Sequence, residues 1–199
     1  MPRASHDLHG SAPDKSKTAL LLIDVINDFD FPEGDELLRL ALPVGHKIAA
    51  LKKRAVEAGI PSIYVNDNFG RWHSDFKKIV AHCKGENSKG REFVELLLPD
   101  QDDYFVLKPK NSGFYSTTLD LLLTHLTAKN LILTGIAGNN CVFFTANDAY
   151  MRDYKVFVPS DCVVSNTEEE NAYALKQMEV VLKADTTIAS NLDLKALSS

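Results

Sequence analysis

The 199-residue chain lacks the features that mark several large classes of protein. No apolar run reaches the roughly 18 residues that a transmembrane helix needs, and the amino-terminal segment has no apolar core of the kind found in signal peptides. The three cysteines, Cys83, Cys141 and Cys162, form no CxxC pair and cannot all be bridged to one another. We therefore expect a cytoplasmic protein rather than a disulfide-stabilised secreted scaffold.

Basic residues are fewer than acidic ones and are not concentrated in one part of the chain. The chain carries 22 Lys and Arg against 27 Asp and Glu, a net charge of −5, and its basic clusters are short and scattered. Nucleic-acid-binding proteins concentrate positive charge on one face, so we expect neither a nucleic-acid nor a membrane partner. No G-x-G-x-x-G or P-loop pattern follows an apolar run, so no nucleotide cofactor is expected.

What the chain does contain is typical of one globular domain, with 45% hydrophobic and 25% charged residues. Residues 1–17 are polar and are expected to form a flexible tail. Residues 18–199 show no internal repeat or low-complexity linker, so they are expected to form a single domain.

Apolar runs that predict strands alternate with segments of helical spacing. Strands are predicted at residues 18–24, 60–67, 103–109, 130–138 and 154–161, with a last short one at 186–190. Helices are predicted at residues 35–59, with Pro43 near the start of the longer part, and at 117–130, 139–153 and 168–184. Thr117 and Thr167 are predicted to open two of these helices through capping boxes. Residues 69–98 are interpreted as a long insertion with short helices. The alternation implies a parallel sheet with helices on both faces.

Polar residues follow the predicted strands. Asp24 ends the first, residues 66–68 end the second, Lys108 ends the third, and a glycine-containing turn leads from the fourth to Cys141. In folds of this kind ligands bind beyond the carboxyl ends of the strands, so these groups are expected to share one rim of the sheet.

A carboxylate, an ammonium and a thiol at one rim favour nucleophilic catalysis. Thiolate is the reactive form of cysteine, and a helix amino terminus and Lys108 are both expected to lower the pKa of Cys141. Asp24 could accept the thiol proton and return it to a leaving amine. Each residue alone has a simpler interpretation: a core cysteine, a turn aspartate and a solvated lysine. Their joint placement favours the catalytic interpretation.

Four segments, taken in order, resemble the isochorismatase-like cysteine hydrolases, a family that includes nicotinamidases and N-carbamoylsarcosine amidohydrolases. They are LLLIDVINDF (20–29), VLKPKNSGFYSTTLD (106–120), LTGIAGNNCVFFTANDA (133–149) and SDCVVSNTEEENAYAL (160–175). The resemblance implies a three-layer α/β/α Rossmann-like fold with a six-stranded parallel sheet. It implies Asp24, Lys108 and Cys141 as a catalytic triad, and a homodimer or homotetramer. It also implies a cis peptide between Ile136 and Ala137, with the Ala137 and Cys141 amides forming an oxyanion hole.

The chain departs from the family pattern at several positions. Ile26 stands where a glutamine is frequent, and Gly138 stands where a threonine is common. Nicotinamidase-type members bind a metal through an Asp-x-His pair and a later histidine, whereas Asp67 is followed by Asn68 and Phe69. His73 and His82 are unpaired loop histidines, so no metal is expected.

A second cysteine and a second lysine are weaker catalytic candidates. Cys162 lacks a glycine turn opening into a helix and is interpreted as structural, and Lys110 lacks the family spacing to Ser112. Core packing is an equally good interpretation of the aromatic residues among the candidates for the substrate pocket. These candidates are Phe29, Asn68, Trp72, Phe114 and Tyr115, with Phe144 as a further possibility.

Three functions remain in view. The first is a cofactor-free cysteine hydrolase that cleaves an amide or related C–N bond of a small molecule through a thioester. The second is an isochorismatase-type vinyl ether hydrolase, in which the cysteine is dispensable, so that Cys141 favours the first. The third is a catalytically idle ligand-binding protein of the same fold.

Overall fold

The structure, a computed structural model, describes residues 15–70 and 75–198. Its sheet contains six strands: β1 (Thr18–Ile23), β2 (Ser62–Asp67), β3 (Tyr104–Lys108), β4 (Asn130–Ile136), β5 (Lys155–Phe157) and β6 (Val163–Val164). The strand order is β3-β2-β1-β4-β5, β6 pairs with β4, and every pairing is parallel. The prediction of a six-stranded parallel sheet is confirmed.

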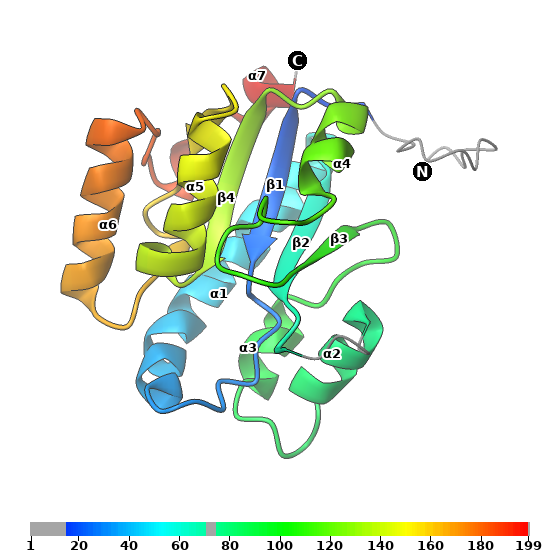
Figure 1. Cartoon of the computed structure of the whole chain (residues 1–199), viewed down its shortest axis with the longest axis vertical. Coiled ribbons are helices and arrows are strands. Elements are labelled where there is room, and N and C mark those ends of the chain that lie inside the picture. Colours follow the sequence, from blue (N-terminus) through cyan, green and yellow to red (C-terminus); the bar gives the residue numbers. More distant parts are fainter. Residues whose placement is uncertain (1–14, 71–74, 199) are drawn as a thin grey trace.

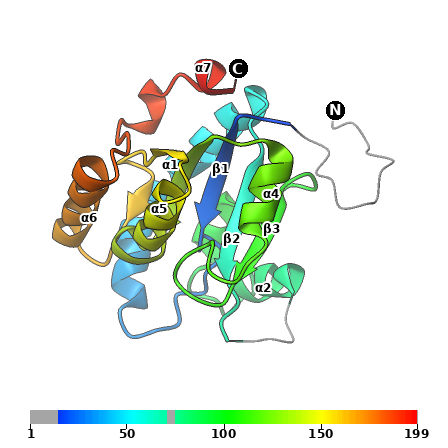
Figure 2. The ribbon, with the colours of Figure 1, turned by 45° about the horizontal axis from the view of Figure 1, so that its top comes forward.

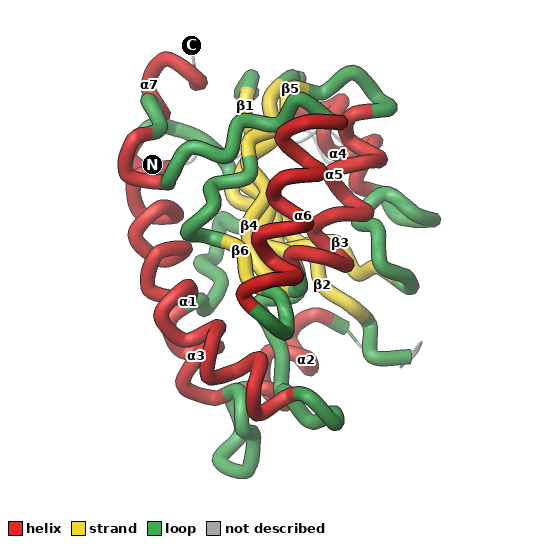
Figure 3. The backbone as a smooth tube through the Cα atoms, turned by 90° about the vertical axis from the view of Figure 1, so that its left-hand side faces the viewer, coloured by secondary structure: helices red, strands yellow, loops and turns green. Residues whose placement is uncertain are grey.

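Helices cover both faces of this sheet. They are α1 (Gly34–Glu57), α2 (Phe76–Cys83), α3 (Arg91–Leu96), α4 (Leu119–Leu126), α5 (Phe143–Tyr150), α6 (Glu168–Val181) and α7 (Leu194–Ser198). Seen edge-on in Figure 3, α1 and α3 lie on one side of the strands and α4, α5 and α6 on the other. Figure 2 shows α4 and α5 in front of the strands, with α6 to their left. The three-layer α/β/α architecture is confirmed.

The central strand β1 explains why the sheet has helices on both faces. All six of its residues are buried. Because successive side chains of a strand point to opposite faces, Leu20 and Leu22 join the core beneath α1, whereas Leu21 and Ile23 join the core beneath α4, α5 and α6. A continuous apolar run is therefore stable here, where a half-exposed strand would alternate.

The predicted sixth strand at residues 186–190 is wrong. The isolated bridge to Phe157 is made by Asp185, directly before that segment, and the segment itself runs into a 3-10 helix at Ala189–Asn191. Ile188 is exposed, so the short apolar run does not enter the sheet. The sixth strand is instead β6, two buried valines that pair beside Gly135 and Ile136.

The predicted helices are present, with differences at their ends. The helix predicted at residues 35–59 is α1, which runs continuously from Gly34 to Glu57 with Pro43 inside it. The predicted capping box at Thr117 is wrong, because α4 begins at Leu119 after Thr118. The Thr117 hydroxyl accepts a hydrogen bond from the Leu119 amide (3.2 Å) and donates to the Gly113 carbonyl (2.5 Å). The second capping prediction is confirmed: Thr167 accepts a hydrogen bond from the Glu170 amide (3.1 Å).

The described part of the insertion after the gap, residues 75–98, lies beyond the carboxyl ends of the strands (Figure 1). It carries α2 and α3, and Phe93 anchors it by packing its buried ring edge-on against Phe29, with ring centroids 5.5 Å apart. The short helices predicted for this region are therefore present. Among the described residues, no helix is long and apolar enough to span a membrane.

Candidate active site

Asp24, Lys108 and Cys141 come together at the carboxyl ends of the strands. Asp24 follows β1, Lys108 ends β3, and Cys141 lies in a π-helical turn (Gly138–Val142) between β4 and α5. The Lys108 Nζ is 2.8 Å from Asp24 Oδ2 and 3.4 Å from Cys141 Sγ. Lys108 is fully buried and Asp24 nearly so, whereas Cys141 is partly exposed. Solvent thus reaches part of Cys141 but not the side chain of Lys108.

The backbone around Asp24 fixes the direction of its carboxylate. Asp24 adopts a left-handed conformation with φ of 51°, which is uncommon for a residue other than glycine. Its amide donates to the Val65 carbonyl (3.0 Å), and its Oδ1 accepts a hydrogen bond from the Asp67 amide (2.7 Å). Oδ2 is thereby directed at Lys108.

The ammonium of Lys108 has three N–H groups and three close partners. Besides Asp24 and Cys141, it donates to the backbone carbonyl of Lys110 (3.2 Å). Lys110 therefore takes part through its main chain, while the residue itself is exposed. Of the two candidate lysines, Lys108 is the one placed between a carboxylate and a thiol.

The turn that carries Cys141 is held by backbone and side-chain hydrogen bonds. The Ile136–Ala137 peptide is cis, and the Ala137 carbonyl accepts hydrogen bonds from the amides of Asn140 (3.0 Å) and Val142 (3.2 Å). Thr145 Oγ1 donates to the Cys141 carbonyl (2.7 Å). Hydrogen bonds to Ala137 before the cysteine and from Thr145 after it therefore hold the turn that carries the Cys141 sulfur.

Two polar side chains, those of Ser165 and Asn171, leave no room for a side chain at Gly138. A Cβ at this position would lie 2.4 Å from Asn171 Oδ1 and 3.0 Å from Ser165 Oγ. Ser165, fully buried, donates to Asn171 (3.1 Å) and accepts a hydrogen bond from the Asn139 amide (2.9 Å). These two residues occupy the space of the side chain that the family pattern has here. Sequence reasoning missed them. Ser165 directly follows two valines, which was a usable signal, whereas Asn171 lies six residues further on, inside α6.

The electrostatics of the site differ from expectation. Burial and the charge of Asp24 raise the pKa of the Cys141 thiol to about 12, and the opposing effect of Lys108 is smaller. The prediction of a lowered thiol pKa is therefore wrong, because it left out desolvation. Burial also raises the pKa of Asp24, against the charge of Lys108. Burial by itself would lower the pKa of Lys108, but the neighbouring Asp24 and Cys141 outweigh it and raise that pKa.

The predicted pocket residues separate into two groups. Phe29 and Phe114 are buried in the two cores, so the structure shows packing rather than a pocket wall for these rings. Asn68 and Tyr115 line a hollow of about 430 Å³. Its other lining residues are Asp67, Gly70, Pro109, Lys110 and Ser116. Phe144 is exposed on α5. Trp72 and His73 lie outside the described residues.

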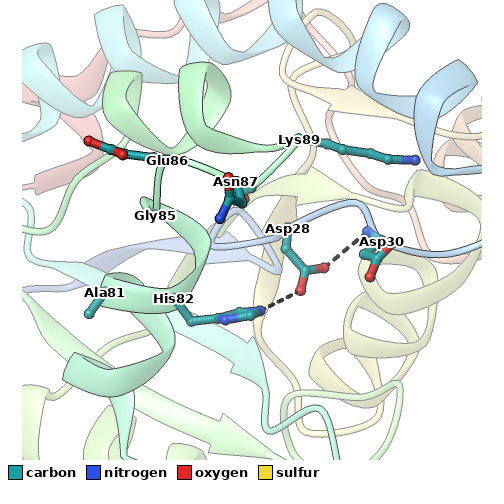
Figure 4. A pocket seen from close by; sticks show the side chains of 9 residues that line it. Asp28, Asp30, Ala81, His82, Gly85, Glu86, Asn87 and Lys89 are labelled. Carbon is teal, nitrogen blue, oxygen red and sulfur yellow. Dashed lines mark hydrogen bonds and ion pairs between the residues drawn. The ribbon is translucent and has the colours of Figure 1, made fainter.

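A second hollow, of about 460 Å³, lies between the segment after β1 and the α2–α3 connection (Figure 4). His82 Nε2 is 2.8 Å from Asp28 Oδ2 there, and the Asp30 amide donates to the other oxygen of Asp28 (3.1 Å). Within residues 15–70 and 75–198, no three His, Cys, Asp or Glu side chains are grouped to hold a metal ion.

The rival cysteine, Cys162, is fully buried, and burial raises the pKa of its thiol.

Comparison with known proteins places this arrangement in a family. The model of the Isochorismatase domain matches residues 18–190. YaaI, an uncharacterized isochorismatase family protein of Bacillus subtilis, is 46% identical over 173 residues, which cover 87% of this chain and 94% of that protein. The ureidoacrylate amidohydrolase RutB of Methylobacterium radiotolerans is 31% identical over 176 residues, 75% of this chain and 68% of its own length.

Solved structures with similar folds support the same family assignment. An isochorismatase-like hydrolase from Alkaliphilus metalliredigens has a TM-score of 0.70 at 27% identity, covering 88% of each chain. N-carbamoylsarcosine amidase from Thermoplasma acidophilum has a TM-score of 0.68 at 25% identity, covering 89% of this chain and 99% of its own. With a family model spanning most of the chain and a relative nearly half identical, the chain belongs to the isochorismatase family of hydrolases.

Proposed function

We propose that the protein is a cysteine-dependent hydrolase that cleaves an amide or related C–N bond of a small molecule. The observation that carries the proposal is the placement of Lys108 Nζ between Asp24 Oδ2 and Cys141 Sγ. The catalytic domain is proposed to comprise residues 18–199, and no cofactor is needed for the steps below.

The protonation states suggest how the reaction begins. A thiol with a pKa of about 12 keeps its proton in the free protein, and Asp24, with a raised pKa, is a stronger base than an ordinary aspartate. The carboxylate is hydrogen-bonded to the thiol. Asp24 would take the proton as the sulfur attacks the carbonyl carbon, so that thiolate forms only when it is consumed.

The remaining steps follow from the same three side chains. Collapse of the tetrahedral intermediate breaks the C–N bond, and Asp24 returns the proton to the leaving nitrogen. Water, activated by the same carboxylate, then hydrolyses the thioester and regenerates the thiol. We propose that the Ala137 and Cys141 amides bind the oxyanion, a contribution that in other hydrolases is about 3 kcal/mol per donor. Lys108 would stabilise both the thiolate and the Asp24 carboxylate.

Two relatives support C–N cleavage through their names. The 31%-identical protein is a ureidoacrylate amidohydrolase, and a structural neighbour at 25% identity is an N-carbamoylsarcosine amidase. Vinyl ether hydrolysis, the other chemistry considered, gives no role to a cysteine nucleophile. The presence of Cys141 beside a base and a cation thus favours the amide reaction.

The test is a substrate panel combined with trapping of the intermediate. Primary amides, carbamoyl compounds and isochorismate would be offered to the wild type and to Cys141→Ala, and Cys141 peptides would be examined by mass spectrometry after acid quenching. We expect C–N cleavage, an acyl mass on Cys141, and a loss of about 1,000-fold or more in the variant. Hydrolysis of isochorismate alone, undiminished in Cys141→Ala, would reject the proposal.

A further inference from the structure

Asp67 is a second carboxylate beside Lys108 that the proposed reaction does not use. Its Oδ2 lies 3.8 Å from the Lys108 Nζ. The three N–H groups of that ammonium are already directed at Asp24, Cys141 and the Lys110 carbonyl. Asp67 is therefore near enough to feel the charge but receives no hydrogen bond from it.

The other polar atoms of Asp67 are occupied. Its amide donates to Asp24 Oδ1 (2.7 Å), and its Oδ1 accepts a hydrogen bond from the Phe69 amide (2.5 Å). Within the described part of the chain, Oδ2 has no hydrogen-bond donor. The side chain is 41% exposed and lines the 430 Å³ hollow together with Asn68 and Tyr115. The backbone of Asp67 is thus fixed against the catalytic carboxylate, while one oxygen remains an open acceptor in the hollow.

Its neighbour Asn68 makes the same hollow more polar. Asn68 Oδ1 accepts a hydrogen bond from the Gly70 amide (2.9 Å), which holds the amide side chain at the wall. A ligand here meets a carboxylate acceptor on the side nearest Lys108. At Asp67 Oδ2 itself, a group with N–H donors finds an acceptor, whereas an anionic group would meet like charge.

We propose that Asp67 Oδ2 binds an N–H of the substrate and so selects small molecules with an unsubstituted amide or ureido group. This inference rests on the proposed function. Cys141 Sγ bonds to the carbonyl carbon, the C–N bond breaks, and Asp24 carries the proton from sulfur to nitrogen. Asp67 accepts a hydrogen bond from the leaving –NH2 throughout and transfers no proton. Esters of the same acyl group lack that donor.

The test compares a primary amide with the methyl ester of the same acid in the Asp67→Asn variant. Asparagine retains an acceptor for the Phe69 amide but removes the charged one in the hollow. We expect kcat/KM for the amide to fall about 10- to 100-fold, and that for the ester to stay within about threefold. Asp102→Asn, an exposed carboxylate at the opposite end of β3, is the matched control and should change neither. Equal losses on amide and ester would overturn the inference and indicate that Asp67 only supports Lys108.

A binding measurement separates this inference from the proposed function. Acetamide and urea would be titrated by NMR into Cys141→Ala with and without Asp67→Asn. Binding at least about fivefold weaker in the double variant supports the role of Asp67 even if no substrate is turned over. Binding of equal strength in the two proteins overturns it.

Discussion

Burial and the charge of Asp24 raise the pKa of the Cys141 thiol, and Lys108 lowers it. At the scale of single residues, the reactivity of the sulfur therefore depends on two neighbours with opposite effects: Asp24 favours the protonated thiol, and Lys108 favours the thiolate. The residue types of the triad could be predicted because each follows an apolar run, and the ends of parallel strands meet at one rim. The sign of the shift in the Cys141 pKa could not be predicted, because desolvation depends on how much of the folded chain covers the thiol.

This balance predicts how alkylation of Cys141 depends on pH. In the wild type, the iodoacetamide rate should still be rising at pH about 10, above the pKa of an ordinary cysteine. Replacing Asp24 with Asn removes the negative charge and should move the profile to lower pH, and Lys108→Met should move it to higher pH. Peptide mass spectrometry would follow the site, with little competition expected from Cys83 and Cys162 because both are fully buried. A profile of the Asp24→Asn protein that coincides with the wild type would contradict this picture.

At the scale of elements, the nucleophile turn is fastened to α6. Asn171, near the start of that helix, contacts Ser165, and Ser165 holds the Asn139 amide of the turn. Asn171 Nδ2 also donates to the Val163 carbonyl at the end of the sheet (3.2 Å). Local sequence patterns predicted the helix and its Thr167 cap, since these depend on neighbouring residues. The hydrogen-bonded link from Asn139 through Ser165 to Asn171, called the clamp below, was missed by sequence analysis. It joins positions 139 and 171, which only the tertiary fold brings together.

The clamp predicts the effect of a single methyl group. Gly138→Ala places a Cβ 2.4 Å from Asn171 Oδ1, so either the turn or the helix must shift. Because a displacement of about 1 Å can cost roughly 100-fold in rate, we expect kcat to fall by at least about tenfold while KM changes less. Adding Asn171→Ala removes the obstructing oxygen and should restore part of the rate. Steady-state kinetics on an amide substrate, with thermal melting as a control for folding, would measure both.

Asn171→Ala alone provides the matched comparison for that cycle. It keeps Gly138 and loses only the hydrogen bonds of the amide, so its rate should lie above that of Gly138→Ala. If the double variant is slower than Gly138→Ala, the two residues do not compete for the same space. The proposed steric conflict between a side chain at position 138 and Asn171 would then be wrong.

At the scale of the whole molecule, the predicted alternation of strands and helices was sufficient for the architecture, but short elements escaped it. Two residues suffice for β6 because Gly135 and Ile136 are already in place beside them. The segment at 186–190 shows the reverse, since the chain pairs with β5 only at Asp185, directly before it, and Ile188 stays exposed. The insertion that covers the carboxyl ends of the sheet could be located by its irregular composition. Its attachment to α1 could not, because it depends on an ion pair between distant segments.

That attachment is the buried side chain of Lys52 on α1. Its Nζ lies 2.6 Å from Asp103 Oδ2 and 2.8 Å from Asp100 Oδ2, in the segment that directly follows the insertion and leads into β3. The side chains of Lys52 and Asp103 are only 9% and 7% exposed, whereas Asp100 is open to solvent. Removing the cation would leave Asp103 buried and without its counter-charge, which typically costs about 3–5 kcal/mol.

Lys52→Met is therefore expected to lower the free energy of unfolding by about 3–5 kcal/mol, measured by urea denaturation at neutral pH. The second change Asp103→Asn removes the stranded charge and should recover much of that loss. Lys176→Met is the matched control, because its ion pair with Glu179 on α6 is exposed and should contribute less than about 1 kcal/mol. A Lys52→Met protein as stable as the control would mean that water reaches Asp103. The insertion would then be held by the packing of Phe93 rather than by charge.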